Sequence, residues 1–577
     1  MIKYPKFFSF GYVSSEGPTQ QQMDESSFDM TFFGEGYSKG KDPQQGKPDL
    51  KICTQVSGPE VAYVSTPIAM VQAAVTILKE PGSLPEGGGV FTPGAAFSKT
   101  KLIERLNKAG LHFKVISRPA DDLMMFGVIA VLVPLVPVRS VYAVTMDTAR
   151  QYQFVVFGAS GFTGQFVVEE LARVLDGAEF RESRLRWAVA GRNQKRLEDV
   201  LSWAAERLSK PQLKLEVGII ICDVSDPPSL DEMCKKASVV LDCVGPYRFF
   251  GEPVIKSCVE NGAHCVDISG EPQFLEGMYA KYNSQAAENG VYIVGSTGFD
   301  SIPADMGVLF TRNRLQGTLT AVESILTFKT GPSSFKGTCI HDGTWQSAIH
   351  GIADQGNLKK LRKQLACKPL PVVGKKLKKR GALFYANEVG QYAIPFLGAD
   401  ASVVRRTQRF LHEHHEETPV QYSAYTAVGG IGSAIKLIFA GLLFVLLTKF
   451  SFGRKLMIKY PKFFSFGYFS SEGPTQQQMD ESSFDMTFFG EGYSKGKDPQ
   501  QGKPDLKICT QVSGPEAGYV STPIAMVQAA VTILKEPGSL PKGGGVFTPG
   551  AAFSKTKLIE RLDKAGLHFK VISTLDA

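Results

Sequence analysis

The stretch FVVFGASGFTG, residues 154–164, decides the fold of this 577-residue chain. An apolar strand leads into a glycine-rich turn, and from Gln165 onward apolar residues recur at helical spacing. Glycines in a turn between a strand and a helix let backbone N–H groups approach a pyrophosphate, which then rests on the positive end of the helix. The residues expected to hold the pyrophosphate of a dinucleotide are Gly158, Ser160, Gly161, Phe162, Thr163 and Gly164.

The spacing of these glycines, GxxGxxG, differs from the GxGxxG of most dinucleotide sites, so a glycine turn without a ligand is the alternative. A second apolar run, Trp187–Ala190, ends in Gly191-Arg192-Asn193, where NAD-selective proteins often place an acid that holds the ribose 2′-hydroxyl. Arg192 suits a 2′-phosphate instead, so the sequence predicts that Arg192 and Asn193 bind NADP(H) in preference to NAD(H). The alternative is that this basic stretch is only the solvated start of a helix.

The alternation of strand and helix continues to residue 296. Strands are expected at Lys214–Cys222, Val239–Cys243, Ala263–Asp267 and Tyr292–Ser296, and helices at 228–235, 251–260 and 272–289. Repeated units of this kind predict an α/β fold of the Rossmann type, a doubly wound parallel sheet with helices on both faces, over residues 146–300. The mixed segments after Val322 predict a second α/β domain with a mixed sheet over residues 301–577, including a core helix at Thr522–Leu534.

Ligands of such sheets bind beyond the carboxyl ends of the strands, which places further candidates in the loops. Gly245 and Pro246 are expected beneath the nicotinamide, and Asp223 at the adenine or ribose. The candidate catalytic residues are Tyr247, Asp267 and Glu271. Tyr247 would donate a proton or hydrogen bond to the substrate, or else pack the turn, and the two acids would act in catalysis or else cap helices.

Residues 1–117 recur almost unchanged as residues 457–573, with five differing positions. The differing pairs are Val13/Phe469, Val61/Ala517, Ala62/Gly518, Glu86/Lys542 and Asn107/Asp563. This favours a gene model that joined the tail of one tandem copy to the whole of the next, with Met146 as a natural start, and a recent duplication is the alternative. The join, residues 118–145, contains an apolar run, Leu123–Val138, that is short for a membrane-spanning helix and fits translated noncoding sequence as well as an anchor.

Composition narrows the class of protein and its compartment. The formal net charge of +8 is mild for this length, and no nucleic-acid partner is expected. Ten Lys or Arg residues and no acid lie between Lys359 and Arg380, which is either a patch attractive to anionic lipid or a solvated loop. The nine cysteines form no CxxC pair, so no metal and no disulfide framework are expected, and a reducing, intracellular compartment fits. Residues 1–17 lack the apolar region of a secretory signal.

An apolar segment, Leu437–Thr448, is bracketed by Lys436 and Lys449. At about 1.5 Å per residue, these twelve residues would cover about 18 Å as a helix, which is too short for a bilayer core of about 30 Å. The segment is therefore expected to dip into one leaflet or to lie at a lipid surface, with a buried core helix as the alternative. The nearby basic run favours a membrane or lipid-droplet surface.

Five motifs occur in order at the ends of the expected strands: FVVFGASGFTGQFVVEEL, VAGRN, VGPYRFFG, VDISGEPQF and GSTGFDSIPADMG. With these motifs the chain from Met146 to its end resembles the saccharopine dehydrogenase-like oxidoreductases of animals, a family similar to saccharopine reductases and to trans-acting enoyl reductases of bacterial glycolipid synthesis. The resemblance implies a nucleotide domain over about 146–300, a second α/β domain, and association with lipid droplets, mitochondria or other membranes.

The sequence and the resemblance together predict an NADP(H)-dependent oxidoreductase that acts on a lipid or acyl substrate at a lipid-droplet or membrane surface. A catalytically silent dinucleotide-binding scaffold on the same surfaces is the alternative, and a reductase of saccharopine is a third possibility. A homodimer is left open.

Overall fold

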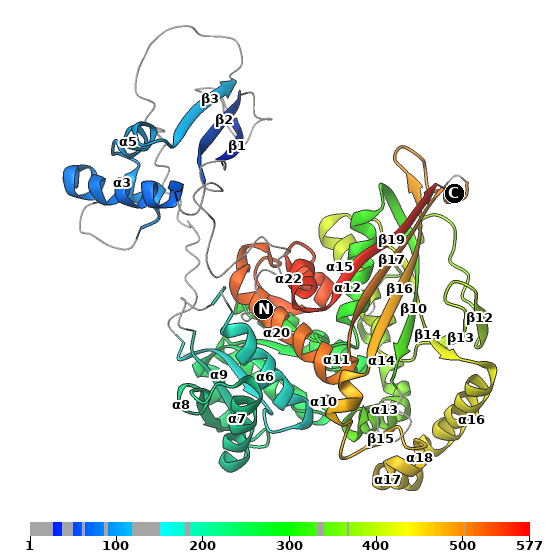
Figure 1. Ribbon diagram of the computed structural model, residues 1–577. Coiled ribbons are helices and arrows are strands. Elements are labelled where there is room, and N and C mark those ends of the chain that lie inside the picture. Colours follow the sequence, from blue (N-terminus) through cyan, green and yellow to red (C-terminus); the bar gives the residue numbers. More distant parts are fainter. Residues whose placement is uncertain are drawn as a thin grey trace. The chain divides into compact units, whose positions relative to one another are not determined.

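The computed structural model describes residues 27–36, 50–60, 64–85, 91–117, 150–177, 179–180, 185–331, 340–365, 368–500 and 502–576. The chain divides into two compact units, Met1–Val141 and Tyr142–Ala577 (Figure 1). The apolar run at Leu123–Val138 and the expected start at Met146 lie outside the described residues.

The first unit holds a three-stranded antiparallel sheet in the order β1-β2-β3. Its elements include β1 (Ser27–Gly36), β2 (Leu50–Pro59), α3 (Thr66–Lys79), α4 (Pro93–Phe97), α5 (Leu102–Lys108) and β3 (His112–Ser117).

The second unit contains a seven-stranded parallel sheet in the order β18-β9-β8-β7-β4-β5-β6, which confirms the predicted doubly wound fold. The strands are β4 (Tyr152–Phe157), β5 (Trp187–Gly191), β6 (Gly218–Ile221), β7 (Ala237–Asp242), β8 (His264–Asp267), β9 (Tyr292–Val294) and β18 (Gly545–Phe547). The helices that follow them are α6 (Phe162–Leu175), α7 (Gln194–Leu208), α9 (Pro227–Lys236), α10 (Tyr247–Asn261) and α11 (Pro272–Glu288).

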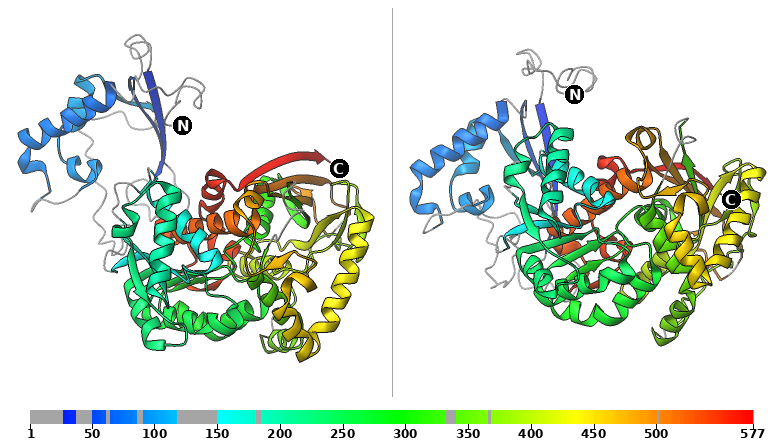
Figure 2. Two further views of the ribbon diagram at one scale, coloured as in Figure 1. Left: turned by 60° about the horizontal axis from the view of Figure 1, so that its bottom comes forward. Right: turned by 90° about the horizontal axis from the view of Figure 1, so that it is seen from below.

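Helices cover both faces of this sheet (Figure 2). Phe154 and Val156 of β4 share one core with α6, α7 and α20 (Thr522–Lys535), whereas Val155 and Phe157 share the opposite core with α9, α10 and α11. Successive side chains of a strand point to opposite faces, so a strand buried on both sides is apolar throughout. This explains why β4 is a continuous apolar run in the sequence.

The structure differs from the prediction at two strands of this sheet. Residues 214–222 were expected to form one strand, but they begin within the short helix α8 (Leu213–Glu216) and only the later residues form β6. The apolar side chain of Leu215 contributed to the strand-like pattern in the sequence, although this side chain is 91% exposed. The edge strand β18 comes from the region that the sequence assigns to the second domain. The sequence does not predict its pairing with β9, because a three-residue strand so far along the chain is too short for a periodic pattern.

A second, mixed sheet has the order β12-β13-β14-β10-β16-β17-β19 and confirms the predicted mixed sheet. β10 (Gly317–Lys329) pairs in parallel with β14 (Gln421–Gly429), and the other pairings are antiparallel. The remaining strands are β12 (Phe384–Ala386), β13 (Gln391–Pro395), β16 (Ser483–Ser494), β17 (Leu506–Pro515) and β19 (His568–Asp576). Side chains of this sheet and of the parallel sheet belong to one continuous core, which holds the two sheets together.

The duplicated sequence adopts the same strand register in both units but differs in burial. Ser27 pairs with Pro59 in the first unit, and the equivalent Ser483 pairs with Pro515 in the second. Helix α20, which confirms the core helix expected at 522–534, packs on α6, β7 and β8. Met526 of α20 is fully buried, whereas its counterpart Met70 of α3 is 74% exposed.

Helix α16 (Ile431–Thr448) contains the apolar segment of the sequence and extends it toward the N-terminus. At about 1.5 Å per residue its 18 residues cover about 27 Å, so the length argument based on twelve residues is revised. Only 11% of the helix is buried, and the core-helix alternative is therefore wrong for α16. The helix Ala517–Lys535 is also long and apolar enough to cross a membrane, but it is 78% buried as a core helix.

Candidate dinucleotide and active site

The glycine turn between β4 and α6 contains two positions where a side chain would be strained or would collide with the backbone. Gly158 has a φ of +78°, and a Cβ atom on it would lie 2.8 Å from Val244 Cγ2. A Cβ atom on Gly164 would lie 2.2 Å from the carbonyl oxygen of Gly158, so the start of α6 rests directly on the turn. A tight turn and a close helix–strand contact are what a pyrophosphate site of this class requires.

The first turn of α6 presents backbone N–H groups that no side chain caps. Gly161 is the N-cap residue, is exposed and contributes no side-chain hydrogen bond. The N–H groups of the following residues, including Thr163, are therefore available to an anion at the positive end of the helix. Ser160 lies beside the next turn, because its Oγ is 3.8 Å from the position of a Cβ atom on Gly191.

The side chain of Phe162 points into a packing contact. Its ring stacks on His341 at a centroid distance of 4.8 Å and meets the ring of Tyr519 edge-on at 4.8 Å. A Cβ atom on Gly473 would lie 2.3 Å from Phe162 Cζ, so this segment also packs closely against the ring. The ring of Phe162 is therefore occupied by packing, which leaves only its backbone for the predicted cofactor contact. The ring joins the glycine turn to the segments that carry His341, Gly473 and Tyr519.

Arg192 lies exposed at the end of β5, and its guanidinium forms no hydrogen bond or ion pair with another described residue. Asp223 follows the neighbouring strand β6, and hydrogen bonds from the Ser225 backbone and hydroxyl, together with the charge of Arg192, lower the pKa of the Asp223 carboxyl. Asn193 Oδ1 accepts a hydrogen bond of 3.0 Å from the backbone N–H of Arg196 and so caps α7. The Asn193 side chain is thus used as a helix cap, whereas the Arg192 guanidinium is exposed beside Asp223.

Gly245 and Pro246 form the turn after β7, on the other side of β4 from Arg192. Tyr247 begins α10, and its hydroxyl donates a hydrogen bond of 2.7 Å to the carbonyl oxygen of Asp242. Burial raises the pKa of this phenol well above its usual value. The Tyr247 hydroxyl is thus engaged in the packing contact that the sequence left open as the alternative to proton donation.

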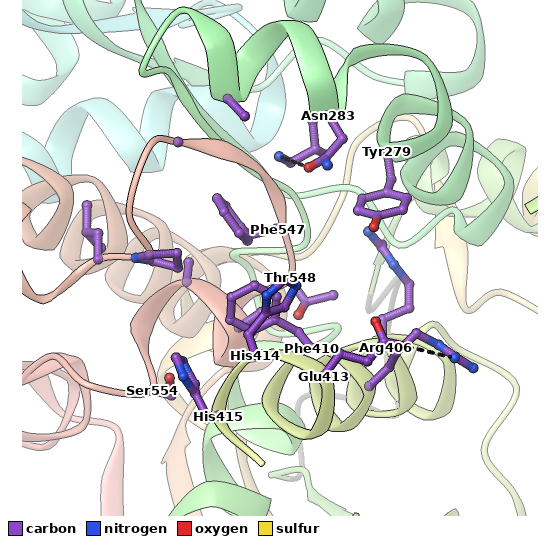
Figure 3. A pocket seen from close by; sticks show the side chains of 18 of the residues that line it. Tyr279, Asn283, Arg406, Phe410, Glu413, His414, His415, Phe547, Thr548 and Ser554 are labelled. Atoms are coloured by element: carbon purple, nitrogen blue, oxygen red, sulfur yellow. Dashed lines mark hydrogen bonds and ion pairs between the residues drawn. The ribbon is translucent and has the colours of Figure 1, made fainter. Parts of the chain in front are cut away.

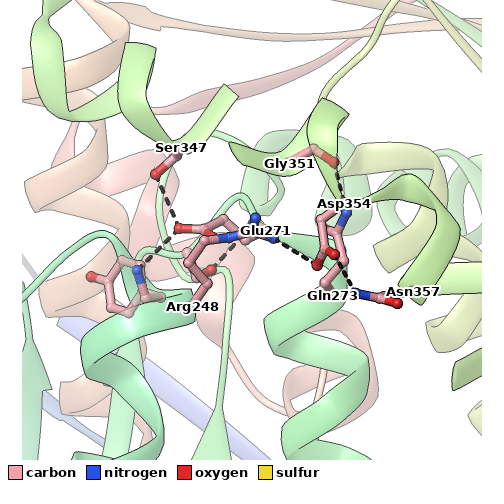
Figure 4. Close-up of polar contacts among 9 residues, drawn as sticks. Arg248, Glu271, Gln273, Ser347, Gly351, Asp354 and Asn357 are labelled. Atoms are coloured by element: carbon pink, nitrogen blue, oxygen red, sulfur yellow. Dashed lines mark hydrogen bonds and ion pairs between the residues drawn. The ribbon is translucent and has the colours of Figure 1, made fainter. Parts of the chain in front are cut away.

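Glu271 is the centre of a buried polar cluster (Figure 4). Its Oε1 accepts hydrogen bonds of 3.0 Å from the backbone N–H of Tyr247 and from Ser347 Oγ, and its Oε2 forms an ion pair of 3.0 Å with Arg248 Nε. Arg248 also lies 3.5 Å from Asp354. Because Glu271 joins α10, the loop before α11 and α13 (Asp342–Ala353), its carboxylate holds three segments in place.

Asp267, at the end of β8, is also fully enclosed. Its Oδ1 accepts hydrogen bonds from the backbone N–H groups of Ser269 at 2.8 Å and Ser296 at 3.1 Å. Burial raises the pKa of this carboxyl to about 7, although these two hydrogen bonds oppose the shift. Asp267 therefore orders the loops after β8 and β9 and is a buried acid that changes charge near neutral pH.

Two further residues, Asp300 and His341, come to this edge of the sheet. Asp300 is half-buried, and its Oδ2 lies 2.6 Å from the position of a Cβ atom on Gly270. The Asp300 carboxyl accepts no hydrogen bond from another described residue, and burial raises its pKa. His341 caps α13 through Nδ1, which accepts a hydrogen bond of 3.2 Å from the backbone N–H of Gly343.

The order of the strands places the candidate residues on two sides of β4. Arg192 and Asp223 follow β5 and β6 on one side of β4, while Gly245, Glu271 and Asp300 lie beyond β7, β8 and β9 on the other. Such a site spans the point where the strand order reverses, with the pyrophosphate at the central turn. The sequence motifs identified the glycine turn and the loops. They did not indicate which side chains of those loops form helix caps, hydrogen bonds or ion pairs within the fold.

A parallel sheet whose first strand leads through these glycines into a closely packed helix defines a dinucleotide-binding protein of the Rossmann class. Residues 154–294 match the family model described as the saccharopine dehydrogenase NADP binding domain. The chain is 64% identical over 425 residues to the saccharopine dehydrogenase-like oxidoreductase of Mus musculus, a match covering 74% of this chain and 98% of that protein. The chain belongs to the saccharopine dehydrogenase-like oxidoreductase family, as the motifs predicted, and its cofactor is NADP(H).

Two more distant relatives match over a similar share of the chain. A protein of Arabidopsis thaliana named a probable mitochondrial saccharopine dehydrogenase-like oxidoreductase is 39% identical over 448 residues, covering 74% of this chain and 97% of that protein. A protein of Caenorhabditis elegans named lipid droplet localized protein is 38% identical over 436 residues, covering 74% of this chain and 99% of that protein.

Proposed function

We propose that this protein is an NADP(H)-dependent oxidoreductase that acts on a lipid or acyl substrate at a lipid-droplet or membrane surface. The observation that carries the proposal is that one helix, α13, contacts both the apolar helix α16 and the buried cluster at Glu271. Trp345 of α13 packs against Phe444 of α16 at a centroid distance of 4.9 Å, and Ser347 of α13 hydrogen-bonds to Glu271. A substrate at the lipid surface is thus close to the helix that borders the site.

The exposed side of α16 supports a position at a lipid surface. Phe439 and Leu442 are each 67% exposed, and the apolar surface continues through Phe452, which is 75% exposed, in α17 (Ser451–Lys459). Lys449 and Lys455 lie beside it with exposed ammonium groups suited to anionic lipid. Because Phe444 and Leu447 pack in a cluster with Trp345 and Met457, α16 is fixed to the folded body along one side. This arrangement fits a helix lying in the interface better than one crossing the bilayer.

Bound NADP(H) supplies or accepts the hydride. The glycine turn and the first turn of α6 hold its pyrophosphate, Arg192 its 2′-phosphate, and the Gly245–Pro246 turn borders its nicotinamide. In the reductive direction the Asp300 carboxyl donates the proton that the substrate takes up. It suits this role because burial raises its pKa and because the carboxyl accepts no hydrogen bond from another described residue. Tyr247, Asp267 and Glu271 act as positioning residues in this proposal, since each already holds backbone groups of the loops.

The test is NADPH oxidation by the full chain, with acyl carbonyl and enoyl substrates presented in phosphatidylcholine vesicles containing phosphatidylserine. We expect vesicle-dependent turnover that is lost in a Phe439→Asp, Leu442→Asp double variant. The matched control is Leu215→Asp, which alters a leucine that is 91% exposed on another helix. Turnover that is equal in the double variant and the control would contradict a role of α16 in reaching the substrate.

Cofactor binding is tested separately with Gly161→Asp, which places a negative charge at the turn that receives the pyrophosphate. We expect this variant to lose NADPH binding, whereas Gly356→Asp, at an exposed glycine with open space around it, should retain it. Retained NADPH binding in Gly161→Asp would show that the turn does not hold the pyrophosphate.

A dinucleotide-binding scaffold without turnover is the second candidate. It is favoured by the engagement of all three predicted catalytic side chains, Tyr247, Asp267 and Glu271, in contacts within the fold. Asp300→Asn distinguishes the two candidates, because it removes the proton donor and keeps the shape of the side chain. An oxidoreductase loses most of its kcat in this variant with NADPH affinity unchanged, whereas a scaffold shows vesicle binding and no turnover with or without the substitution.

A further inference from the structure

A cavity of about 860 Å³ lies between α11, α14 (Gln355–Leu365), α15 (Asp400–His415) and the segment that carries β18 (Figure 3). This volume is within the range of about 300–1,000 Å³ that is typical of small-molecule sites. β18 is the edge strand of the parallel sheet, four strand positions from β4, which corresponds to about 19 Å at about 4.8 Å per strand. The cavity is therefore separate from the dinucleotide turn after β4.

The charge of the cavity wall is predominantly positive. The charged residues that line it are Arg362, Arg405, Arg406, Arg409, Lys542, Lys555, Glu276 and Glu413. Both acids are already paired: Glu276 accepts hydrogen bonds from Nε and Nη2 of Arg362, and Glu413 lies 3.3 Å from Arg409. Among the described residues, Arg405, Lys542 and Lys555 form no ion pair with a carboxylate of the cavity wall, so the wall carries more positive than negative charge.

Arg405 of α15 is an exposed cation of this wall, and its guanidinium forms no hydrogen bond or ion pair with another described residue. Desolvation and the charges of Arg362 and Arg409 lower its pKa, whereas the charge of Glu276 opposes the shift. On another wall, Lys555 Nζ lies 3.3 Å from His415 Nδ1. A planar guanidinium can bind two oxygens of one phosphate, which makes arginine well suited to phosphate esters.

The rest of the wall is apolar. Leu540, Phe547 and Ala551 line it from the C-terminal segment, and the ring of Phe410 packs edge-on against Phe547 at a centroid distance of 5.5 Å. Figure 3 shows these two rings on the side of the cavity away from Tyr279. A ligand that fills the cavity therefore meets cations at one part of its surface and apolar side chains at another.

We propose that this cavity binds a phosphate monoester carried on an apolar body, with Arg405 and Lys542 at the phosphate and Leu540 and Phe547 at the apolar part. The site goes beyond the proposed oxidoreductase function and does not depend on it. A lipid with a phosphate headgroup and a free phosphate ester share this chemistry, and the apolar wall favours the lipid.

The duplicated sequence supplies the most informative substitution. Lys542 is one of the five positions at which the two copies differ, and the first copy has Glu86 there. A carboxylate in place of Lys542 would repel a phosphate at the cavity. Lys503→Glu makes the same change of charge at an exposed lysine outside the cavity and is the matched control.

The experiment is calorimetric titration of the full chain, saturated with NADPH, with dihexanoyl phosphatidic acid below its micelle concentration. We expect saturable binding that weakens about tenfold or more in Arg405→Ala and in Lys542→Glu and is unchanged in Lys503→Glu. Dihexanoyl phosphatidylcholine, which has the same acyl chains but a phosphodiester, should bind weakly. Glycerol 3-phosphate, which lacks the apolar body, should also bind weakly.

Unchanged NADPH affinity and unchanged unfolding temperature of the variants show that the cavity, and not the fold or the dinucleotide turn, is affected. Absence of saturable binding of phosphatidic acid, or equal affinity in wild type, Arg405→Ala and Lys542→Glu, overturns the proposal. Equal affinity for glycerol 3-phosphate and phosphatidic acid overturns its apolar part and assigns the cavity to free phosphate esters.

Discussion

Ser347 Oγ donates a hydrogen bond of 3.0 Å to Glu271 Oε1, although the two residues are 76 positions apart in the chain. The same carboxylate neutralises Arg248, whose side chain is only 11% exposed. Because this ion pair is removed from water, each charge depends on the other. The contact therefore joins the loops of the parallel sheet to α13 by a polar link that solvent cannot replace.

Glu271→Gln should lower the free energy of unfolding by roughly 3 kcal/mol, because the Arg248 guanidinium would remain buried without its full countercharge. Glu252→Gln is the control, since the ion pair between Glu252 and Lys281 is largely exposed and should contribute less than about 1 kcal/mol. Denaturant unfolding of the two variants measures the difference. Equal losses would mean that burial of the Arg248–Glu271 pair does not increase its contribution to the free energy of unfolding.

Asp267 should make the stability of the protein depend on pH. Its folded pKa of about 7 exceeds an unfolded value of about 3.9, so the folded state retains a proton that the unfolded state releases. Stability is therefore greatest below the unfolded pKa and falls as pH rises between about 4 and about 7. Asp267→Asn, which keeps the hydrogen-bond acceptor, should become progressively more stable relative to wild type over this window. Parallel stability curves for the two proteins would show that Asp267 does not titrate in this way.

Arg192 should determine the preference for NADPH over NADH. Arg192→Ala is expected to weaken NADPH binding about tenfold or more and to leave NADH binding unchanged, because only NADPH carries the 2′-phosphate. Arg192→Lys keeps the charge but loses the planar fork, so its affinity should be intermediate. Fluorescence titration of both cofactors gives the ratio, and an equal loss for the two would assign Arg192 another role.

The duplicated helices provide an internal comparison of burial at one sequence. Met526→Ala in α20 should lower the free energy of unfolding by about 2–5 kcal/mol, since the side chain is fully buried. The same substitution at Met70 in α3, which is 74% exposed, should change it by less than about 0.5 kcal/mol. Urea unfolding measures both changes. A comparable loss for Met70→Ala would show that Met70 is buried in solution.

The sequence predicted those features that depend on residues close together in the chain. The glycine turn was recognisable because the strand, the turn and the helix start follow one another within residues 152–164. The roles of Asn193 and Glu271 could not be recognised in this way, because a polar residue after a strand can bind a ligand, cap a helix or form an ion pair. Which of these applies is decided by Arg196 in the first case and by Ser347, far along the chain, in the second.

The positively charged cavity was beyond prediction for the same reason. Its arginines come from α14 and α15, whereas Lys542 and Phe547 come from a segment more than a hundred residues further on. The apolar segment of α16 was found by composition, but its helix begins six residues earlier, at Ile431. Polar and glycine residues interrupt the apolar sequence at the N-terminal end of the helix, so a count of apolar residues alone does not detect its first turns.

The placement of β18 has a consequence for synthesis on the ribosome. The parallel sheet is complete only when Gly545–Phe547 pair with β9, and α20 must also be present to cover one face of β7 and β8. Domains commonly fold as units while the chain emerges. Here the edge of the parallel sheet at β9 is closed only after nearly the whole chain has emerged, and until then β9 is an open edge that can pair with another chain.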